Sequence, residues 1–319
     1  MQHAGTNAMP IKKKKPSWDK IKKRIIREKE IWLLCIPLII WVLLFSYYPM
    51  YGIIIAFKKY IPGGPMFSAK WVGFTYFKQF FQSPDFTIVI RNTLSISGLN
   101  ILLGFPAPII LAVLINELRR KYFKKFIQTV SYMPHFISWV VTASILFTLL
   151  GNEGIVNDLL QKLGLTNQPI AFLTTGKYFW WVLTFTNIWK GIGWSSIIYL
   201  SAISGIDEEL YQAGAVDGLG RFGMVWHIII PGIMPTIILL WILGIGGILN
   251  AGFEQQLLLG NDLTREYHEV IDTYAYKYGI QLGRYAYGTA IGLFKSIIGL
   301  ALVFITNKIS KKIFDLSII

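Results

Sequence analysis

Six long apolar runs, separated by short polar stretches, dominate the pattern of hydrophobic and polar positions along the chain. Each run is close to or longer than the roughly 20 residues that an α-helix needs to cross a bilayer, and none carries more than one charged side chain. They cover residues 31–50, 92–116, 126–152, 178–206, 228–253 and 285–307, and the first apolar stretch continues to residue 57. The pattern predicts an all-α membrane protein with six transmembrane helices and both termini on one side of the membrane.

Prolines and glycines interrupt three of the predicted spans. Pro106 and Pro108 lie in the second and Pro134 in the third, and such interruptions are tolerated where neighbouring helices or water satisfy the freed carbonyls. Three glycines of the fifth run allow close helix packing: Gly244, Gly246 and Gly247.

The distribution of Lys and Arg orients these spans. With the N-terminus inside the cell, 19 of the 31 Lys and Arg residues lie on the cytoplasmic side, 10 in the outer segments and two within spans. Cytoplasmic loops carry the excess of Lys and Arg. We therefore expect a multi-pass protein of the cytoplasmic membrane, with both termini and the polar segment 207–235 in the cytoplasm.

The N-terminal tail is strongly basic and has the character of the first part of a signal peptide. Cleavage is not expected, because the apolar run that follows is too long and residues 45–50 offer no small-residue cleavage site. Two interpretations stay open for the tail. It either anchors the first span to anionic lipid headgroups or serves only to set the topology.

Composition supports the membrane class and excludes several others. The chain is 54% hydrophobic, its mean hydropathy is +0.50 and its formal net charge is +14. That charge is clustered beside apolar runs rather than spread over a face, which argues against nucleic-acid binding. The single cysteine, Cys35, cannot form a disulfide within the chain.

No pattern of an enzyme is present in the sequence. There is no glycine-rich phosphate loop with Lys-Ser or Lys-Thr, so no ATP site is expected in this chain. The four histidines lack metal-ligand spacing: His3, His135, His227 and His268. We expect no catalytic residue, no metal and no cofactor.

The polar segment 207–235 between the fourth and fifth runs predicts a helical hairpin. Asp207 can cap a helix whose first turn carries two acids, at the positive end of the helix dipole. Gly218 suits a left-handed position that ends this helix in a sharp turn. A second short helix is expected from Arg221 until Pro231 interrupts it. The small residues between would let another protein's backbone approach closely.

The same segment resembles the EAA loop of ABC-importer permeases, by which a membrane subunit docks on its ATPase. Gln212-Ala213-Gly214 takes the place of Glu-Ala-Ala, Gly218 follows six residues later, and Ile228-Ile229-Ile230-Pro231 matches the Ile-x-Leu-Pro end. Two residues depart from the pattern: Gln212 replaces the acid, for which Glu208 and Glu209 nearby can substitute, and Ile230 replaces Leu. The residues assigned to ATPase coupling are Glu208, Glu209, Gln212, Ala213, Gly214, Asp217, Gly218 and Pro231.

Four further segments resemble binding-protein-dependent permeases for oligosaccharides, most of all the polysaccharide and lipoprotein-associated permeases of Gram-positive bacteria. They are residues 71–81, 132–140, 189–203 and 285–299. The resemblance implies a type I ABC importer permease fold with a cytoplasmic coupling hairpin at 207–231, between spans 4 and 5. The expected organisation is a basic tail (1–30), a first span (31–57), an extracytoplasmic loop (58–87), a five-span permease core (88–307) and a C-terminal tail (308–319).

The resemblance also implies partners and a mechanism. It implies a second homologous permease, a cytoplasmic ATPase dimer that binds the ATP, an extracytoplasmic solute-binding protein and a sugar substrate, in a lipid membrane. Transport would proceed by alternating access. An ATP-independent carrier or channel is the main rival, but carriers show inverted repeats or acids in mid-span. A second rival keeps the importer and changes its cargo to an amino acid or a peptide.

The fourth predicted span carries the best candidates for contact with the cargo. Asn187, Lys190 and Trp194 are spaced to share one helix face, and an indole with amide and ammonium donors suits a sugar. Lys190 has a second interpretation, a structural lysine that pairs with a carbonyl or with an acid of the partner. Asn250 and Glu254, near the outer end of the fifth run, are expected at the mouth of the cavity.

Overall fold

A computed structural model describes residues 27–314 of the chain. Regular secondary structure in these residues is helical, apart from one isolated antiparallel bridge between Lys58 and Trp71. The predicted all-α class is therefore confirmed. The expected basic tail lies outside the described residues as far as residue 26, and the expected C-terminal tail does so from residue 315 on.

The chain forms two compact units, residues 1–54 and 55–319. The described part of the first unit is one helical stretch that runs on to the start of the second. It consists of α2 (Lys29–Val42), a π turn (Leu43–Tyr47) and a 3-10 segment (Tyr48–Phe57). At 29 residues it is long and apolar enough to cross a membrane.

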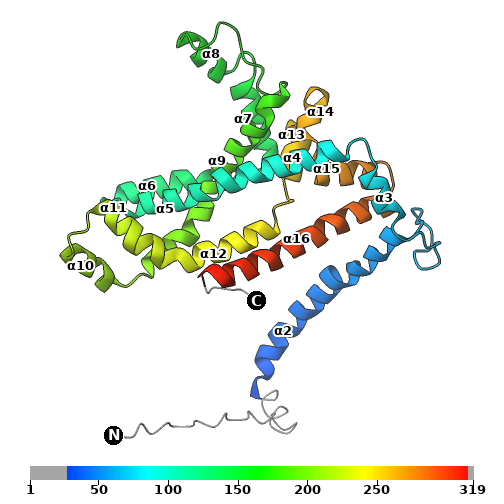
Figure 1. The fold of residues 1–319 in the computed structure, drawn as a ribbon, viewed down its shortest axis with the longest axis horizontal. Helices are drawn as coiled ribbons and strands as arrows, with labels where there is room; N and C mark the ends of the chain where they lie inside the picture. The colour runs from blue at the N-terminus through cyan, green and yellow to red at the C-terminus, as the bar shows by residue number, and fades with distance from the viewer. Residues whose placement is uncertain (1–26, 315–319) are drawn as a thin grey trace. The chain divides into compact units, whose positions relative to one another are not determined.

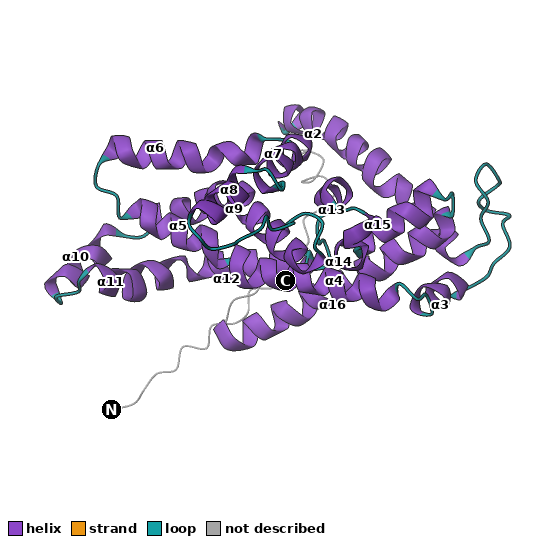
Figure 2. Ribbon diagram, turned by 90° about the horizontal axis from the view of Figure 1, so that it is seen from above, coloured by secondary structure: helices purple, strands orange, loops and turns teal. Residues whose placement is uncertain are grey.

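The second unit contains the remaining helices (Figures 1 and 2). The helices that precede its longest central element are α3 (Thr75–Phe81), α4 (Phe86–Leu99), α5 (Pro106–Asn116), α6 (Lys121–Tyr132), α7 (Trp139–Leu150) and α8 (Ile155–Lys162). The later helices are α9 (Gly176–Ser204), α10 (Glu208–Val216), α11 (Arg221–Met224), α12 (Ile230–Gly246), α13 (Phe253–Leu259), α14 (Arg265–His268), α15 (Ile271–Tyr276) and α16 (Tyr285–Phe314).

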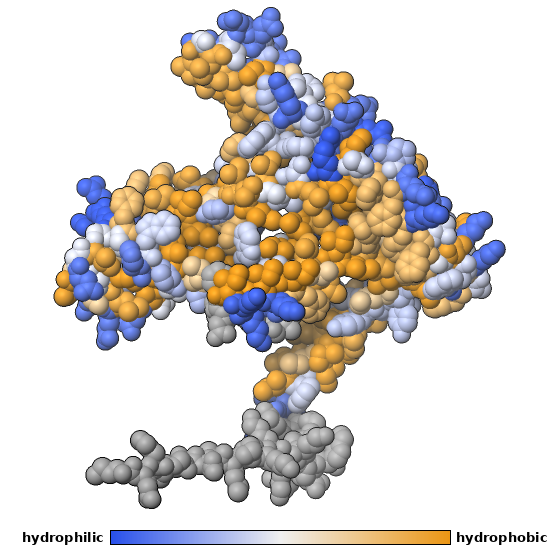
Figure 3. Space-filling model, in the orientation of Figure 1, coloured by the Kyte–Doolittle hydropathy of each residue, from blue (hydrophilic) through white to orange (hydrophobic). Residues whose placement is uncertain are grey.

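Helix α9 is the central element of this unit, because it contacts α4, α5, α6, α12 and α14. The buried core lies in separate clusters along it. One cluster joins Ile115 of α5, Tyr199 and Ile203 of α9 and Ile233 of α12. Apolar residues cover much of the visible face over α5, α12 and α16, and polar residues gather around α10 and α11 (Figure 3). Such a surface is what a lipid-embedded bundle requires.

Five helical stretches are long and apolar enough to cross a membrane: Lys29–Phe57, Phe86–Asn116, Trp139–Lys162, Arg221–Gly246 and Tyr285–Ile313. Helix α9 matches the fourth predicted span and is 29 residues long, but it is not among them. Polar side chains, Asn187 and Lys190 above all, lower its hydropathy. The count of six spans therefore stays a prediction.

The third predicted span, 126–152, is wrong in its bounds. Helix α6 ends at Tyr132 and a 3-10 turn, Met133–Phe136, follows. Helix α7 then starts anew, with the side chain of Ser138 accepting a hydrogen bond from the backbone N–H of Val141 at 3.3 Å. Pro134 disfavours the α-helical turn ahead of it, and the chain becomes extended at Ile137 and Ser138, which separates α7 from the 3-10 turn.

The expectation that Pro231 ends the second arm of the hairpin is also wrong. Helix α11, a π turn (Val225–Ile229) and α12 form one 26-residue stretch, and Pro231 lies in its first α12 turn. This helix ends at Gly246, seven residues before the predicted boundary at Phe253. Close packing at Gly246 is confirmed, since a Cβ on Gly299 of α16 would lie 2.8 Å from the Gly246 carbonyl oxygen.

Candidate functional site

The hairpin α10–α11 is built as its sequence predicts. The side chain of Asp207 accepts a hydrogen bond from the backbone N–H of Glu209 at 3.1 Å and caps α10. Gly218 has a φ of 77° and no atom within 4 Å of the position a Cβ would take. The N-cap and the left-handed turn are therefore confirmed, and the turn is open to solvent.

The small residues of α10 serve two different contacts. Gly214 is buried, and a Cβ there would lie 2.6 Å from Cδ1 of Ile228. Its small size lets the second arm of the hairpin approach, and not another protein as expected. Ala213 and Ala215, on either side, are exposed and remain available to a partner.

The hairpin also exposes apolar side chains that sequence reasoning missed. Val216 is 88% exposed and Phe222 is 85% exposed, in the same hairpin as the exposed acids Glu208 and Glu209. Large apolar groups on a polar surface mark interaction sites when they gather. Their position inside an otherwise polar segment was the available signal.

The base of the hairpin packs against the helix bundle. Ile229 and Ile233 are buried in the cluster around Tyr199, and Tyr211 of α10 packs against the same cluster. Burial raises the pKa of Tyr211, and the negative charge of Glu117 at the end of α5 raises it further. The hairpin is thus attached to α5 and α9 as well as to α12.

A second candidate region surrounds the break between α6 and α7. The ammonium group of Lys190 in α9 donates hydrogen bonds to the carbonyl oxygens of Pro134 (3.2 Å), His135 (3.1 Å) and Ile137. It also lies 5.4 Å from the ring centre of Trp139. Lys190 therefore supplies a donor to three carbonyls at the break, of which that of Pro134 also accepts a hydrogen bond from the backbone N–H of Ile137 at 3.2 Å, as its structural interpretation anticipated.

An open cavity of about 410 Å³ lies beside this lysine. Its polar and aromatic lining residues come from the break, from α9 and from α13: His135, Ser138, Trp139, Asn187, Lys190 and Glu254. Asn187 accepts a hydrogen bond from Gln255 at 3.2 Å and reaches Asn100 at 3.5 Å. Three predicted cargo residues, Asn187, Lys190 and Glu254, are thus brought together.

The other two predicted cargo residues lie elsewhere. Trp194 stacks on the ring of His135, with centroids 4.5 Å apart and planes 3° apart, and does not line the cavity. Asn250 lines a neighbouring cavity of about 230 Å³ that also contains Asn100. Sequence reasoning missed His135, Trp139 and Gln255. Pro134, which lies near His135 and Trp139, is visible in the sequence, but the sequence does not show that Lys190 of α9 lies next to this break.

The family described as the binding-protein-dependent transport system inner membrane component matches residues 104–315. The chain belongs to this family. The match covers the hairpin, the break and the cavity, and it confirms the resemblance first noted in the hairpin.

Individual relatives of this transport-system component are similar over nearly the whole chain. Protein LplB of Bacillus subtilis (strain 168) is 46% identical over 287 residues, or 90% of each chain. The polygalacturonan/rhamnogalacturonan transport system permease protein YteP of the same organism is 41% identical over 312 residues, or 98% of this chain and 96% of its own.

Solved structures extend the comparison to three dimensions. A chain of a bacterial ABC transporter involved in the import of the acidic polysaccharide alginate is 41% identical, with a TM-score of 0.84. The match covers 92% of this chain and 99% of that one. A second structure holds that transporter in complex with an alginate pentasaccharide-bound periplasmic protein, with the same TM-score and 93% of this chain covered.

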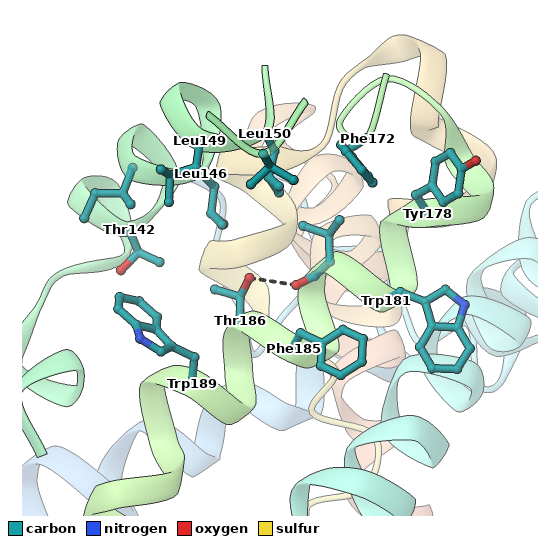
Figure 4. Close-up of a pocket in the computed structure, with 13 residues that line it drawn as sticks. Thr142, Leu146, Leu149, Leu150, Phe172, Tyr178, Trp181, Phe185, Thr186 and Trp189 are labelled. Atoms are coloured by element: carbon teal, nitrogen blue, oxygen red, sulfur yellow. Dashed lines mark hydrogen bonds between the residues drawn. The ribbon is translucent and has the colours of Figure 1, made fainter. Parts of the chain in front are cut away.

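A third cavity of this transport-system component, of about 500 Å³, is apolar (Figure 4). Side chains of α7, α8 and α9 line it, among them Leu149, Phe185 and Trp189. The hydroxyl of Thr186 is occupied by a 2.7 Å hydrogen bond to the carbonyl of Val182. An apolar wall of this kind suits an acyl chain or a helix rather than a sugar.

Ion pairs brace the end of the bundle opposite the hairpin. Lys295, to which the sequence assigned no role, pairs with Asp272 of α15. Arg265 lies 3.5 Å from Asp85 and 3.6 Å from Glu269, and Lys277 lies 3.7 Å from Glu269. These pairs attach the segment 262–281 to α4 and α16.

Proposed function

We propose that the chain is one permease subunit of an ATP-driven importer that moves an oligosaccharide across the cytoplasmic membrane by alternating access. The observation that carries the proposal is the polar hairpin α10–α11, which projects from one end of an apolar bundle and continues without a break into α12. A soluble partner that moves this hairpin would move a membrane-spanning helix with it.

ATPase coupling would use the exposed surface of the hairpin. Glu208, Glu209 and Gln212 offer polar contacts, and Val216 and Phe222 offer apolar area that docking would remove from water. The tight turn around Asp217 and Gly218 lies at the tip, and Pro231 lies where the lever joins the span. ATP itself would bind to the partner ATPase dimer, so this subunit needs no cofactor and catalyses no reaction.

The membrane arrangement follows from the same proposal. Helix α9 would cross the bilayer as the sixth span, its polar side chains facing protein and the cavity. Both termini and the hairpin would then lie in the cytoplasm. We retain the division into a first span (31–57), an extracytoplasmic loop (58–87) and a five-span core (88–307).

The cavity at Lys190 would form part of the path of the cargo. Aromatic rings with a few convergent polar groups are typical of small-molecule sites; here Trp139 offers a ring, and Asn187 and Glu254 offer hydrogen-bond partners. Lys190 would hold the wall of the cavity while its charge favours an acidic sugar. Asn250 would meet the cargo in the neighbouring cavity, and Trp194 would keep the ring of His135 in position.

The relatives support a sugar cargo and the expected partners. Their names specify polygalacturonan, rhamnogalacturonan and alginate, which are all acidic polysaccharides or contain acidic sugars. The periplasmic protein in the second solved structure supports an extracytoplasmic solute-binding protein. A second permease and an ATPase dimer complete the proposed complex.

Reconstituted transport tests the proposal. The complex of both permeases and the ATPase is placed in liposomes with its binding protein, and uptake of labelled oligosaccharides is measured with and without ATP. We expect uptake that needs both ATP and the binding protein. Uptake of amino acids or peptides instead would reassign the cargo, and uptake by this chain alone without ATP would indicate a carrier or channel.

A further inference from the structure

Five cations gather within seven residues where α5 leads into α6: Arg119, Arg120, Lys121, Lys124 and Lys125. All are exposed except Lys124, which is half-buried. None of them forms an ion pair with a carboxylate in the described part of the chain. Like charges this close repel one another, so a bound anion would stabilise the cluster.

Four cations elsewhere in the second unit do pair with a carboxylate among the described residues, while others, such as Lys59, Lys70 and Lys78, do not. Arg265, Lys277 and Lys295 each pair with a carboxylate, and Lys162 pairs with Asp158 at 2.7 Å. Glu117, two residues before Arg119, is the nearest acid in the sequence, and in the described part of the chain it forms no ion pair with the five cations.

Helix α6 presents three faces, and one of them packs against other helices among the described residues. Ile127 packs into the cluster around Tyr199, and Gly193 of α9 has room for no side chain against the backbone of Ser131. These contacts fix the rotation of the helix.

The second face of α6 is apolar and exposed. Tyr122, Phe126 and Val130, spaced four residues apart along the helix, are 91%, 61% and 49% exposed. The third face carries Lys121, Lys124 and Lys125. Helix α6 runs back alongside α5 (Figures 1 and 2), so its cationic start lies at the membrane–water interface while its apolar face faces the acyl chains, with the lysine heads reaching toward the headgroups.

The start of α6 lies at the end of the unit that carries the polar hairpin. The turn between α5 and α6 lies at the same end as the hairpin α10–α11 (Figures 1 and 2). Helix α5 is the last part of the membrane-spanning stretch Phe86–Asn116. The cations thus follow directly on the end of a span, at the depth of phosphate headgroups.

We propose that α6 and the turn before it bind an anionic phospholipid of the cytoplasmic leaflet, with the cations on its phosphate groups and Tyr122, Phe126 and Val130 on its acyl chains. The assignment to the cytoplasmic leaflet rests on the proposed topology. An acidic protein surface would match the cations but would leave the apolar face in water, so the lipid accounts for both faces.

Thermal unfolding of the purified transporter in neutral detergent tests the proposal, with phosphatidylglycerol or phosphatidylcholine titrated into the micelles. We expect phosphatidylglycerol alone to raise the unfolding midpoint. In the triple variant K121Q/K124Q/K125Q its half-saturating concentration should rise at least about tenfold, because each cation near an anionic surface contributes a factor of roughly five. The variant K121R/K124R/K125R should retain the response.

The triple variant K59Q/K70Q/K78Q is the matched control, since it removes the same charge from three exposed lysines outside the cluster. Equal weakening in both triple variants, or none in either, would overturn the proposal. If inorganic phosphate raises the unfolding midpoint as much as phosphatidylglycerol does, the cluster binds a free anion and not a lipid. If the triple variant K121Q/K124Q/K125Q keeps its response to phosphatidylglycerol but no longer co-purifies with the ATPase, the cluster is a contact for the ATPase. Failure of sugar uptake would not affect these readouts, because they need no transport.

Discussion

Two helix irregularities of the second unit lie at or just before a proline, and the backbone accommodates them differently. Before Pro231 the backbone forms the π turn Val225–Ile229, and the helix continues from Arg221 to Gly246. At Pro134 the helix stops, and Lys190 of α9 donates hydrogen bonds to the carbonyls left behind. Near Pro231 the helix continues through its own π turn, whereas near Pro134 a side chain of another helix, Lys190, donates hydrogen bonds to the backbone carbonyls.

The local repair recurs elsewhere in the chain. The π turns Leu43–Tyr47 and Asn100–Gly104 end two residues before Pro49 and Pro106, as the third ends two residues before Pro231. Proline lacks an N–H and its ring clashes with the carbonyl four residues earlier. A π turn widens the backbone by one residue, which moves that carbonyl aside.

The difference has mechanical consequences. An interruption repaired within its own helix leaves one continuous rod, which suits a helix that must pass movement from the hairpin into the membrane. An interruption repaired by another helix ties two elements together and turns backbone carbonyls and a cation toward an open space. The cavity of about 410 Å³ lies at that second interruption.

Removing Lys190 should have the largest effect on this comparison. Lys190→Met removes the side-chain donor from three carbonyls, of which only that of Pro134 keeps a backbone N–H, from Ile137, and we expect a loss of about 2–3 kcal/mol in stability and a lower yield of the assembled complex. Lys190→Arg keeps a donor and should lose less. Thermal unfolding and size-exclusion chromatography measure both.

Lys177→Met is the matched control, because Lys177 lies in the same helix but contacts the ring of Tyr178 rather than a carbonyl. It should leave stability unchanged. If Lys190→Met keeps normal stability and loses uptake of acidic sugars only, Lys190 serves the cargo and the break is held by other contacts.

Substitutions in the hairpin α10–α11 should have the second-largest effect. Gly218→Arg forces a bulky residue into a left-handed conformation, which costs about 1–2 kcal/mol, and it places a cation at the tip. Less ATPase should co-purify and substrate-stimulated hydrolysis should fall. Gly218→Asn tolerates the same φ and should retain both. Gly220 has a φ of −74°, so Gly220→Arg tests bulk and charge without the backbone strain. Full activity of Gly218→Arg would remove the docking role from this turn.

Local signals predicted much of the fold. Apolar runs located the long helices apart from the third, whose bounds were wrong, and Tyr285 was correctly expected to begin the last one. Asp207 and Gly218 act through neighbours within a few residues, so the cap and the turn of the hairpin were visible in the sequence.

The rest depends on distant contacts or on an unrecognised backbone pattern. The carbonyls that Lys190 meets lie more than 50 residues away in the chain, and only folding brings Glu254 to the same cavity. Pro231 was misread because a proline also permits continuation after a π turn. Gly214 was assigned to a partner because the arm that packs on it lies beyond the turn.

Pro231→Ala should separate the two kinds of interruption at smaller cost. The helix no longer needs its π turn, so stability should change by less than about 1 kcal/mol or increase. A return to α-helical spacing would rotate the hairpin relative to the span, and hydrolysis should couple less well to uptake. Pro106→Ala has the same spacing without a hairpin and should leave coupling intact.

In Pro134→Ala the break should persist, because Lys190 still holds the carbonyls. Continuous helix across residues 132–139 in that variant would contradict the comparison.

The smallest effect is expected at the seat of the hairpin, in alkaline solution. Burial raises the pKa of Tyr211, and the charge of Glu117 raises it further. The folded state therefore favours the neutral phenol, so the contribution of Tyr211 to stability is full below the unfolded pKa of about 10 and is lost as pH rises through the folded value. Tyr211→Phe cannot ionise and should flatten the decline of the unfolding midpoint above pH 10. Tyr122→Phe, at a position 91% exposed, should leave the decline unchanged. Identical profiles for both variants would mean that the hairpin is not seated on the end of α5, and that only its continuity with α12 joins it to the bundle.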